Sequence, residues 1–405
     1  MDLRKKLHES VLSLHGWVTK NGWAGYDPYD IQHWRVLLPG KLSSGTPLRW
    51  PVAAAVRIGE MFPMWSRRLL VPKRVFPKAM GLFVHAYSRL SQLIGAVGYE
   101  DIADECAVWL LANRSPGYEG LGWGLPLGWQ TRMFIPAGTP CATVGAVCGD
   151  AFFELYQRTG NERYLDTCLE VCRGFVKDLN IDEMGPDAIC FSYTPLDHFH
   201  VHNANLMVAA FLAKVGRAAG RDDLLETASR AGNYALVEQR EDGSLDYWGR
   251  DQSTGLHRDL YHSGFEIRAL DTLGRHTGRI EFREAAERYF AFFKGAYFDS
   301  EGAPFRNPGD PGVIDIHGCA EAMICCAQVE SKIPDAGEIL SRVTQWTIDN
   351  MQMSDGAFAY RLLNLDGRAR RIDTPFIRWG QAWMMRALAA AMEALTDGGN
   401  GRGDG

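Results

Sequence analysis

The chain has 405 residues, of which 46% are hydrophobic and 23% are charged. These proportions are typical of a globular protein with a large core. The formal net charge of −6 is small and spread along the chain, so it does not favour a nucleic acid or an anionic membrane surface as a partner. No run approaches the ~18 consecutive apolar residues of a membrane-spanning helix, and nothing in the sequence specifies an oligomeric state.

The first segment, Met1 to Lys20, predicts an amphipathic helix with charged residues throughout its length. It lacks the apolar region of an export signal, and we therefore expect a cytoplasmic protein. The nine cysteines include no CxxC pair, and several fall within apolar helical patterns. This usage favours reduced thiols in the core over a disulfide framework.

A repeat of about 58 residues follows farther along the chain. In each unit, a helix that ends in a glycine is followed by a polar break and a second helix. Glycine ends helices readily because it takes the left-handed conformation without a Cβ penalty. The three glycines Gly160, Gly220 and Gly278 are 60 and 58 residues apart. The second helices are predicted over residues 161–179, 221–239 and 279–298.

Each second helix runs into a glycine-containing turn and a short extended piece. The clearest turns contain Gly243, Gly302 and Gly356, and weaker versions occur at Gly120 and Gly185. We expect the three clear turn glycines to have positive φ or to lie in tight turns. The helix after each turn is apolar nearly all round, whereas the second helices keep a polar face. This alternation predicts buried inner helices and exposed outer helices.

Further helices are expected over residues 51–70, 78–97 and 101–112, which brings the total to about six helix hairpins. Six hairpins of this size close into an all-α (α/α)6 toroid, a six-hairpin barrel, formed by residues 1–396 as a single domain. An open solenoid is the structural alternative, and it would need polar caps at its ends. The glycine-rich tail, residues 397–405, is expected to be disordered.

Inner helices of a toroid all begin at the same end, so residues at these starts converge around one mouth. His202, His262 and His317 are 60 and 55 residues apart, which places them at equivalent positions. A lone histidine at a helix start is more often structural, and a nearby aspartate can be an N-cap. The recurrence of the pattern nevertheless favours a function. The candidate catalytic residues are His202, His262, His317, Tyr193, Tyr261, Asp259, Asp315 and Glu266.

Aromatic and polar residues also gather at these helix starts and in loops expected to lie over the mouth. The aromatic residues are equally suited to packing under turns and to stacking on sugars. The candidate substrate-binding residues are Tyr26, Asp30, Trp129, Arg132, Asn203, Asn205, Trp248, Arg378, Trp379 and Gln381.

His198, His200 and His202 alternate on an extended segment, which is a possible arrangement of zinc ligands. The alternation breaks where the next helix begins, however, and no H-E-x-x-H motif or cysteine pair supports a metal site. Fingerprints of a serine nucleophile, a P-loop and a dinucleotide-binding fold are absent. We therefore predict neither a metal nor a cofactor.

Short motifs in the chain match a known group of proteins. They are Tyr26 to Asp30, His202 to Leu206, Gln239 to Ser244, Tyr261 to Phe265, Asp315 to His317, Asn350 to Gly356 and Arg378 to Trp383. With these motifs the chain, chiefly from about Tyr193 to Leu395, resembles bacterial α/α-toroid proteins of polysaccharide (exopolysaccharide) biosynthesis. The resemblance implies the toroid fold and a glycan context, and it carries over no catalytic roles.

More distantly, the turn from Gln239 to Trp248 resembles the repeat turn of terpene cyclases and protein prenyltransferases. The Asp-x-Asp-Asp acid motif of the squalene-type cyclases is missing, which counts against that chemistry. Similar toroids carry glycosidases, uronate lyases and uronate C5-epimerases, but a shared fold does not by itself assign a function.

These observations favour a carbohydrate-active enzyme that holds an oligo- or polysaccharide at the mouth. Hydrolysis needs two carboxylates roughly 5–9 Å apart, for which Asp259, Glu266, Asp315 and Glu321 are candidates. Proton abstraction beside a uronate carboxylate instead needs a base such as His or Tyr and groups that neutralise the carboxylate. The density of His, Tyr and Asn favours this second chemistry, of the C5-epimerase or lyase type. The alternatives are a glycoside hydrolase, a non-catalytic glycan-binding or scaffold protein, and a terpene-cyclase-like enzyme.

Overall fold

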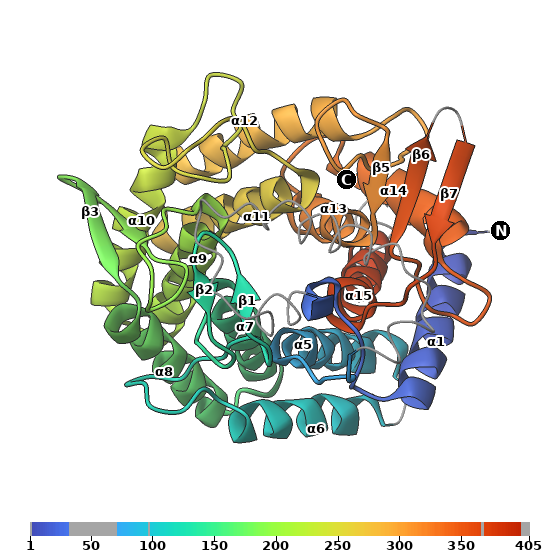
Figure 1. Ribbon diagram of the computed structural model, residues 1–405, viewed down its shortest axis with the longest axis horizontal. Coiled ribbons are helices and arrows are strands. Elements are labelled where there is room, and N and C mark those ends of the chain that lie inside the picture. The colour runs from blue at the N-terminus through green and yellow to red at the C-terminus, as the bar shows by residue number, and fades with distance from the viewer. Residues whose placement is uncertain (1, 32–70, 96–97, 366–367, 398–405) are drawn as a thin grey trace, which may run out of the picture.

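The computed structural model describes residues 2–31, 71–95, 98–365 and 368–397, which form two concentric layers of helices (Figure 1). Neighbouring inner helices contact one another all round the ring, and the last contacts the first. The predicted (α/α)6 toroid is therefore confirmed, and the open solenoid is excluded. The inner helices are α5 (Pro77–Ile94), α7 (Ala142–Thr159), α9 (His202–Ala219), α11 (Leu260–Thr277), α13 (Ile316–Val329) and α15 (Ala382–Asp397). The outer helices are α6 (Tyr99–Ala112), α8 (Glu162–Asp178), α10 (Asp222–Glu238), α12 (Ile280–Tyr297), α14 (Ala336–Met351) and α1 (Leu3–Asn21).

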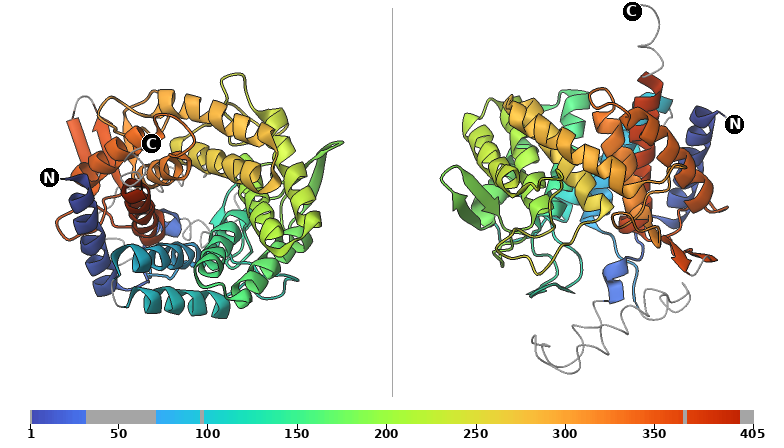
Figure 2. Two further views of the ribbon diagram at one scale, coloured as in Figure 1. Left: turned by 180° about the vertical axis from the view of Figure 1, so that it is seen from behind. Right: turned by 90° about the horizontal axis from the view of Figure 1, so that it is seen from above.

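The N-terminal helix α1 closes the outer layer of the ring. It packs against α14 and α15, so the first helix of the chain is the outer partner of the last (Figure 2). Its buried side chains Leu7, Val11, Leu14 and Val18 recur at helical spacing, as expected for an amphipathic helix. The predicted helix over residues 51–70 and the predicted disordered tail lie outside the described residues, except Asp397, which ends α15.

The repeat read from the glycines is also confirmed. Inner helices α7, α9 and α11 end at Gly160, Gly220 and Gly278, which have φ angles of 65°, 64° and 78°. The outer helices that follow them begin and end within one residue of the predicted ranges.

The turn glycines pack against the outer helices. Gly243, Gly302 and Gly356 have φ angles of 84°, 92° and 95°. A Cβ atom on Gly243 would lie 2.4 Å from the backbone oxygen of Arg288 in α12, and one on Gly356 would lie 2.2 Å from the backbone oxygen of Ser13 in α1. Each turn therefore packs directly on the backbone of the next outer helix, where only a glycine fits.

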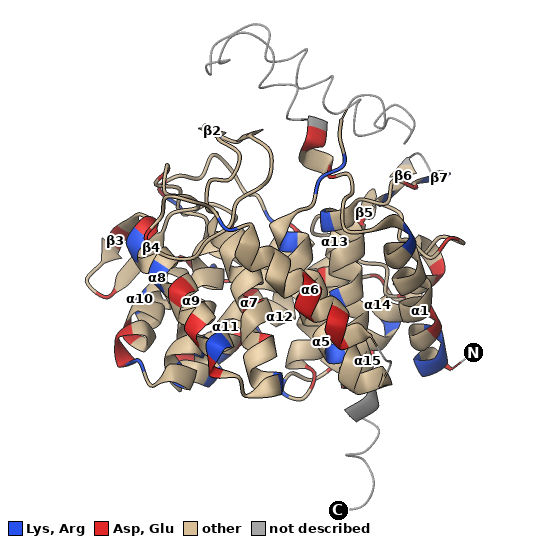
Figure 3. Cartoon of the chain, turned by 90° about the horizontal axis from the view of Figure 1, so that it is seen from below, with Lys and Arg blue, Asp and Glu red and all other residues tan. Residues whose placement is uncertain are grey.

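Short antiparallel strands and two irregular helical turns connect the helices, mainly at the end of the ring where the inner helices begin (Figure 3). The π-helical turn runs directly into α15, and β5 runs into α13. The strands are β1 (Trp129–Gln130), β2 (Phe134–Ile135), β3 (Ile181–Gly185), β4 (Ala188–Phe191), β5 (Val313–Asp315), β6 (Arg361–Leu365) and β7 (Arg368–Ile372), and the turns are η1 (Pro28–Ile31) and η2 (Ile377–Gln381). They pair as β1–β2, β3–β4 and β5–β6–β7.

The core supports the prediction of buried, reduced cysteines. All nine cysteines are buried and free of disulfides. Among the described helices, none combines the length and the apolar character needed to cross a membrane.

Candidate functional site

The end of the ring where the inner helices begin, called the mouth here, carries a connected set of aromatic rings. Tyr29 stacks on Trp129 with ring centroids 6.1 Å apart, and Trp129 meets Tyr193 edge-on at 5.9 Å. Tyr29 also contacts Trp379 at 5.9 Å, and Trp379 contacts Tyr261 at 5.7 Å. These rings come from five separate segments of the chain, so the closed ring of helices is what brings them together.

Two of the three histidines at equivalent repeat positions join this set. The rings of His262 and His317 lie 4.3 Å and 4.8 Å from that of Tyr261. His202 is placed differently, because its ring lies 5.2 Å from Tyr234 of outer helix α10 and its Nδ1 is 2.6 Å from the backbone oxygen of Asp246. His202 thus belongs to the contact between α9 and α10 rather than to the cluster at Tyr261.

Asp259 is both the N-cap of α11 and the partner of the His262 ring. Its Oδ1 accepts the backbone N–H of His262 at 3.0 Å, and its Oδ2 lies 2.8 Å from Nδ1 of the same residue. Burial alone would raise the pKa of Asp259, but the adjacent His262 ring and the two hydrogen bonds lower it below its usual value. The ionised carboxylate therefore fixes the His262 ring. No described residue bonds the second ring nitrogen, Nε2, and 18% of the His262 side chain is exposed.

His317 is buried, yet neither of its ring nitrogens has a hydrogen-bond partner among the described residues. Burial lowers its pKa well below the usual value, and the positive charges of Lys78 and Arg378 lower it further. The ring is therefore neutral at physiological pH. A buried polar group without a partner costs free energy in the absence of a ligand, so His317 offers two nitrogens to a bound molecule.

The four candidate carboxylates have separate partners. Asp315 accepts hydrogen bonds from Trp379 Nε1 at 2.8 Å and from Arg361 Nε at 2.6 Å, and it also caps α13. Glu266 accepts a 2.6 Å hydrogen bond from Tyr289 of outer helix α12. Neither arrangement leaves a free acid–base pair beside His262. The remaining pairs are Glu321 with Arg268 and Asp259 with His262.

The N-terminal loop is fastened to the mouth by a buried ion pair. Arg378 in η2 donates two hydrogen bonds to Asp27, at 2.7 Å and 2.6 Å. Asp30 accepts the backbone N–H of Asp27 at 2.6 Å, and the backbone oxygen of Tyr26 accepts the N–H of Ile377 at 3.0 Å. Arg378, Asp30 and Tyr26, all predicted to bind substrate, therefore hold Tyr29 in the aromatic set.

The other predicted binding residues divide into two groups. Asn205 bonds the backbone of Phe191 and of Ala231, and Gln381 bonds the backbone of Phe358 on both its amide atoms. Both side chains are fully engaged in holding neighbouring segments together.

Arg132, Trp248 and Asn203 are less fully engaged with neighbouring segments. The Arg132 guanidinium lies 3.6 Å above the Trp248 ring and donates to the backbone oxygen of Gln252. The buried side-chain oxygen of Asn203 has no hydrogen-bond partner in the described part of the chain.

Lys78 is a mouth residue that the sequence-based prediction did not include. It is the second residue of α5, and its Nζ donates a 3.2 Å hydrogen bond to Thr143 Oγ1, which lies 3.3 Å from the Tyr193 hydroxyl. Burial, with a contribution from Arg378, lowers the pKa of Lys78 to about 8. The rule that inner-helix starts converge on one mouth, applied to α5, was the signal that pointed to this residue.

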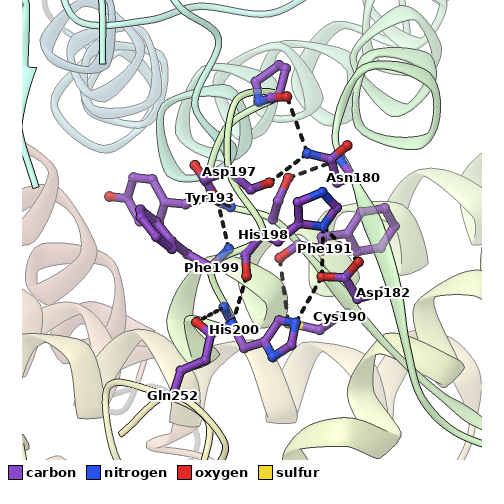
Figure 4. Close-up of polar contacts among 12 residues, drawn as sticks. Asn180, Asp182, Cys190, Phe191, Tyr193, Asp197, His198, Phe199, His200 and Gln252 are labelled. Atoms are coloured by element: carbon purple, nitrogen blue, oxygen red, sulfur yellow. Dashed lines mark hydrogen bonds and ion pairs between the residues drawn. The ribbon is translucent and has the colours of Figure 1, made fainter. Parts of the chain in front are cut away.

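The histidines before α9 do not assemble into the metal site that their alternation made conceivable. His198 Nδ1 lies 2.9 Å from Asp182, and His200 Nε2 lies 2.9 Å from the same carboxylate (Figure 4). His200 Nδ1 is 2.8 Å from Asp251, and His202 faces α10. A different trio could hold a metal, because single ligand atoms of His257, Asp259 and His262 all lie within 4.8 Å of one another. Two imidazoles and a carboxylate suit a transition metal.

A cavity of about 440 Å³ lies between the inner helices, beyond the mouth cluster. Phe265 lines this cavity and also contacts His317 and Trp383, with ring centroids 5.8 Å and 5.3 Å away. The cavity is strongly charged. Its lining includes His85, Arg89, Asp150, Glu154, Lys214, Arg268, Arg386 and Glu393. Charged residues within otherwise apolar inner helices were the sequence signal for it.

No family model matches the chain, and no curated protein matches it in sequence. Solved structures do match. The cellobiose 2-epimerase of Bacillus thermoamylovorans B4167 gives a TM-score of 0.61 at 13% identity, over 79% of this chain and 88% of that protein. A D-mannose isomerase gives 0.60 at 11% identity, over 80% and 87%. An unsaturated glucuronyl hydrolase specific for heparin gives 0.59 at 12% identity, over 97% and 98%. At these identities the likeness shows the fold alone, a six-hairpin, glycosidase-like toroid.

Proposed function

We propose that this protein is a carbohydrate-active enzyme that transfers a proton at a carbon beside a uronate carboxylate, as C5-epimerases and lyases do. The observation that carries the proposal is the Asp259–His262 pair at the mouth. A carboxylate bonded to Nδ1 fixes the proton on that nitrogen and leaves the lone pair of Nε2 to act as a base. Nε2 of His262 is the atom without a bond to any described residue.

The neighbours of His262 suit proton transfer in both directions. Burial raises the pKa of Tyr261 well above its usual value, so its phenol keeps its proton and gives it up only to a strong base such as a carbanion. Burial keeps His317 neutral, with both ring nitrogens open. Epimerisation needs one group that removes a proton and another that returns one. The Tyr261 ring contacts those of both His262 and His317, so the three side chains lie together.

The surroundings support a sugar as the substrate. The rings of Tyr29, Trp129, Tyr193 and Trp379 offer apolar faces and polar edges of the kind that pack on sugars. Three structural neighbours are an epimerase, an isomerase and a glucuronyl hydrolase, each named for a reaction on a sugar. The polysaccharide-biosynthesis context rests on the resemblance of the sequence motifs.

Glycoside hydrolysis fits the site less well. A hydrolase needs one protonated and one ionised carboxyl group facing the same glycosidic bond. Asp315 is fully engaged by Trp379 and Arg361, and Glu266 bonds Tyr289 in the outer layer.

Incubation with uronate-containing oligosaccharides in D₂O tests the proposal. Solvent deuterium at C5, or a 4,5-unsaturated product, is the expected result. New reducing ends without either signal would assign a hydrolase. Binding without any change in the sugar would assign a glycan-binding protein, and either result contradicts the proposal.

A further inference from the structure

Lys78 is a buried ammonium without a counter-ion in the described part of the chain. Only 8% of the residue is exposed, and its one hydrogen bond to a described residue goes to the neutral hydroxyl of Thr143. An ammonium group has three N–H donors, so two remain for another partner. No described carboxylate lies within ion-pair distance of Nζ.

The position of Lys78 makes this arrangement costly without a ligand. It is the second residue of α5, where the helix dipole disfavours a positive charge. Burying a lone charge is more unfavourable still. Other buried charges at the mouth have partners, since Arg378 pairs with Asp27 and Asp315 with Arg361. Lys78 differs from them, and this contrast indicates that an anionic group of a bound molecule supplies the missing partner.

The surroundings indicate where that group would lie. Thr143 links Lys78 to the hydroxyl of Tyr193, whose ring belongs to the aromatic set. His317 is close enough to both Lys78 and His262 for each charge to lower its pKa. Lys78 therefore shares one neighbourhood with the proton-transfer group and the sugar-packing rings.

We propose that Lys78 binds the carboxylate of a hexuronate unit whose C5 proton is exchanged at His262. This inference rests on the proposed function for the position of the sugar. When the C5–H bond breaks, the proton passes to Nε2 of His262 and the electron pair delocalises onto the carboxylate oxygens. The ammonium of Lys78 stabilises the second negative charge that develops there. Return of a proton from Nε2 of His262 to C5 restores the carboxylate and the neutral imidazole.

Paired sugars that differ only in the carboxylate test the role of Lys78. Binding of D-glucuronate and D-glucose is measured by calorimetry on the full chain carrying His262→Gln, so that no turnover interferes. We expect this parent to bind glucuronate more tightly than glucose. Lys78→Met should weaken glucuronate binding at least tenfold and leave glucose binding unchanged, and Lys78→Arg should retain part of the preference. Lys294→Met removes an exposed lysine of α12 that pairs with Asp335, and this control should match the parent.

Equal affinity for glucuronate in the parent and in Lys78→Met overturns the inference, and so does the absence of any preference for glucuronate in the parent. An equal loss for both sugars also overturns it, because the variant would then have damaged the whole site. Turnover of the chain with His262 intact is measured separately. Selective loss of glucuronate binding in Lys78→Met, together with undiminished turnover in His262→Gln, would refute the proposed proton transfer while leaving the carboxylate site standing.

Discussion

Asp259 bonds His262 twice, through the backbone N–H at 3.0 Å and through ring Nδ1 at 2.8 Å. The Asp259 side chain is therefore both the helix cap that the sequence suggested and a carboxylate that orients the ring. The cap fixes the start of α11, and this start in turn fixes the position of the ring. A catalytic role and a structural role have to be separated by measuring turnover and stability on the same variants.

His262→Gln is expected to lower turnover about 100-fold or more, the usual share of general acid–base catalysis. Its melting temperature should change little, because glutamine keeps the backbone N–H that Asp259 accepts. Asp259→Asn should lose less turnover, since its amide oxygen can still accept a hydrogen bond from the ring. Its stability should also change little, because asparagine caps a helix about as well as aspartate. Turnover and thermal melting on both variants are the measurements.

His198→Gln is a matched control for this pair. His198 also precedes an inner helix and bonds an aspartate, but it is exposed and lies at Asp182, away from Tyr261. We expect its turnover to equal that of the wild type. A His262→Gln variant that melts at a lower temperature and remains fully active would end the catalytic assignment.

The pH dependence of binding gives a second test of Lys78. Burial first, then the neighbouring Arg378, lowers the pKa of Lys78 to about 8, and only the ammonium form attracts a carboxylate. Affinity for glucuronate should therefore be constant below about pH 7 and fall by up to tenfold per pH unit above about pH 8. The charged and titratable groups near the ammonium are Arg378, Asp27, Cys141, Cys148 and His317.

Lys78→Arg separates Lys78 from these neighbours, because arginine keeps its charge throughout this range. Its affinity, measured by calorimetry between pH 6 and pH 9.5, should show no fall. The same fall in Lys78→Arg as in the wild type would show that another group titrates.

The architecture was predictable because the repeat depends on residues that act locally. A glycine that ends three successive inner helices and another in each clear turn recur at a nearly constant spacing, and the ends of the three outer helices between them were placed within one residue. Closure by α1 was not predictable from that repeat, since α1 lies at the far end of the chain from α15. It depends on a long-range contact that leaves no periodic signal.

The position of the candidate site was predictable, but the side chains that meet there were less so. Equivalent repeat positions predicted that His202, His262 and His317 converge, whereas only His262 and His317 lie beside Tyr261 and His202 turns toward Tyr234. Equivalent backbone positions do not fix a side-chain rotamer, which depends on what the neighbouring outer helix offers. Lys78 was missed because it precedes the repeat units, so that only the rule of converging inner-helix starts pointed to it.

The turn glycines allow backbone strain to be separated from close packing. Gly220 and Gly243 both have positive φ, at 64° and 84°, but a Cβ atom on Gly220 would meet nothing within 4 Å. One on Gly243 would lie 2.4 Å from the backbone oxygen of Arg288. Gly220→Ala should therefore cost about 1 kcal/mol from the left-handed backbone alone. Gly243→Ala should cost about 2–4 kcal/mol, because α12 must also shift. Denaturant unfolding measures both, and equal losses would contradict the packing role.

Glu321, which bonds Arg268 of the charged cavity, is expected to make stability depend on pH. It is fully buried, and burial raises its pKa from 4.5 to about 7, against the opposing effect of Arg268 and Arg386. Although Arg268 Nε lies only 2.7 Å away, the cost of burying the charge outweighs this single bond.

The sign of the effect follows from proton binding. Between pH 4.5 and pH 7 the folded chain holds a proton on Glu321 that the unfolded chain releases, so the stabilising contribution present below pH 4.5 is lost as pH rises to 7. Glu321→Gln removes this titration while keeping the shape of the side chain. The stability of this variant relative to the wild type should therefore increase across this window, by on the order of 1–3 kcal/mol.

Glu284→Gln, on the exposed face of α12, controls for the loss of a surface carboxylate and should track the wild type at every pH. Urea unfolding at intervals between pH 4.5 and pH 8 measures all three chains. A constant difference between Glu321→Gln and the wild type would mean that Glu321 is ionised throughout. The Arg268–Glu321 contact would then be a persistent buried salt bridge, and Glu321→Gln would be less stable than the wild type at every pH because it leaves the charge of Arg268 without its counter-ion.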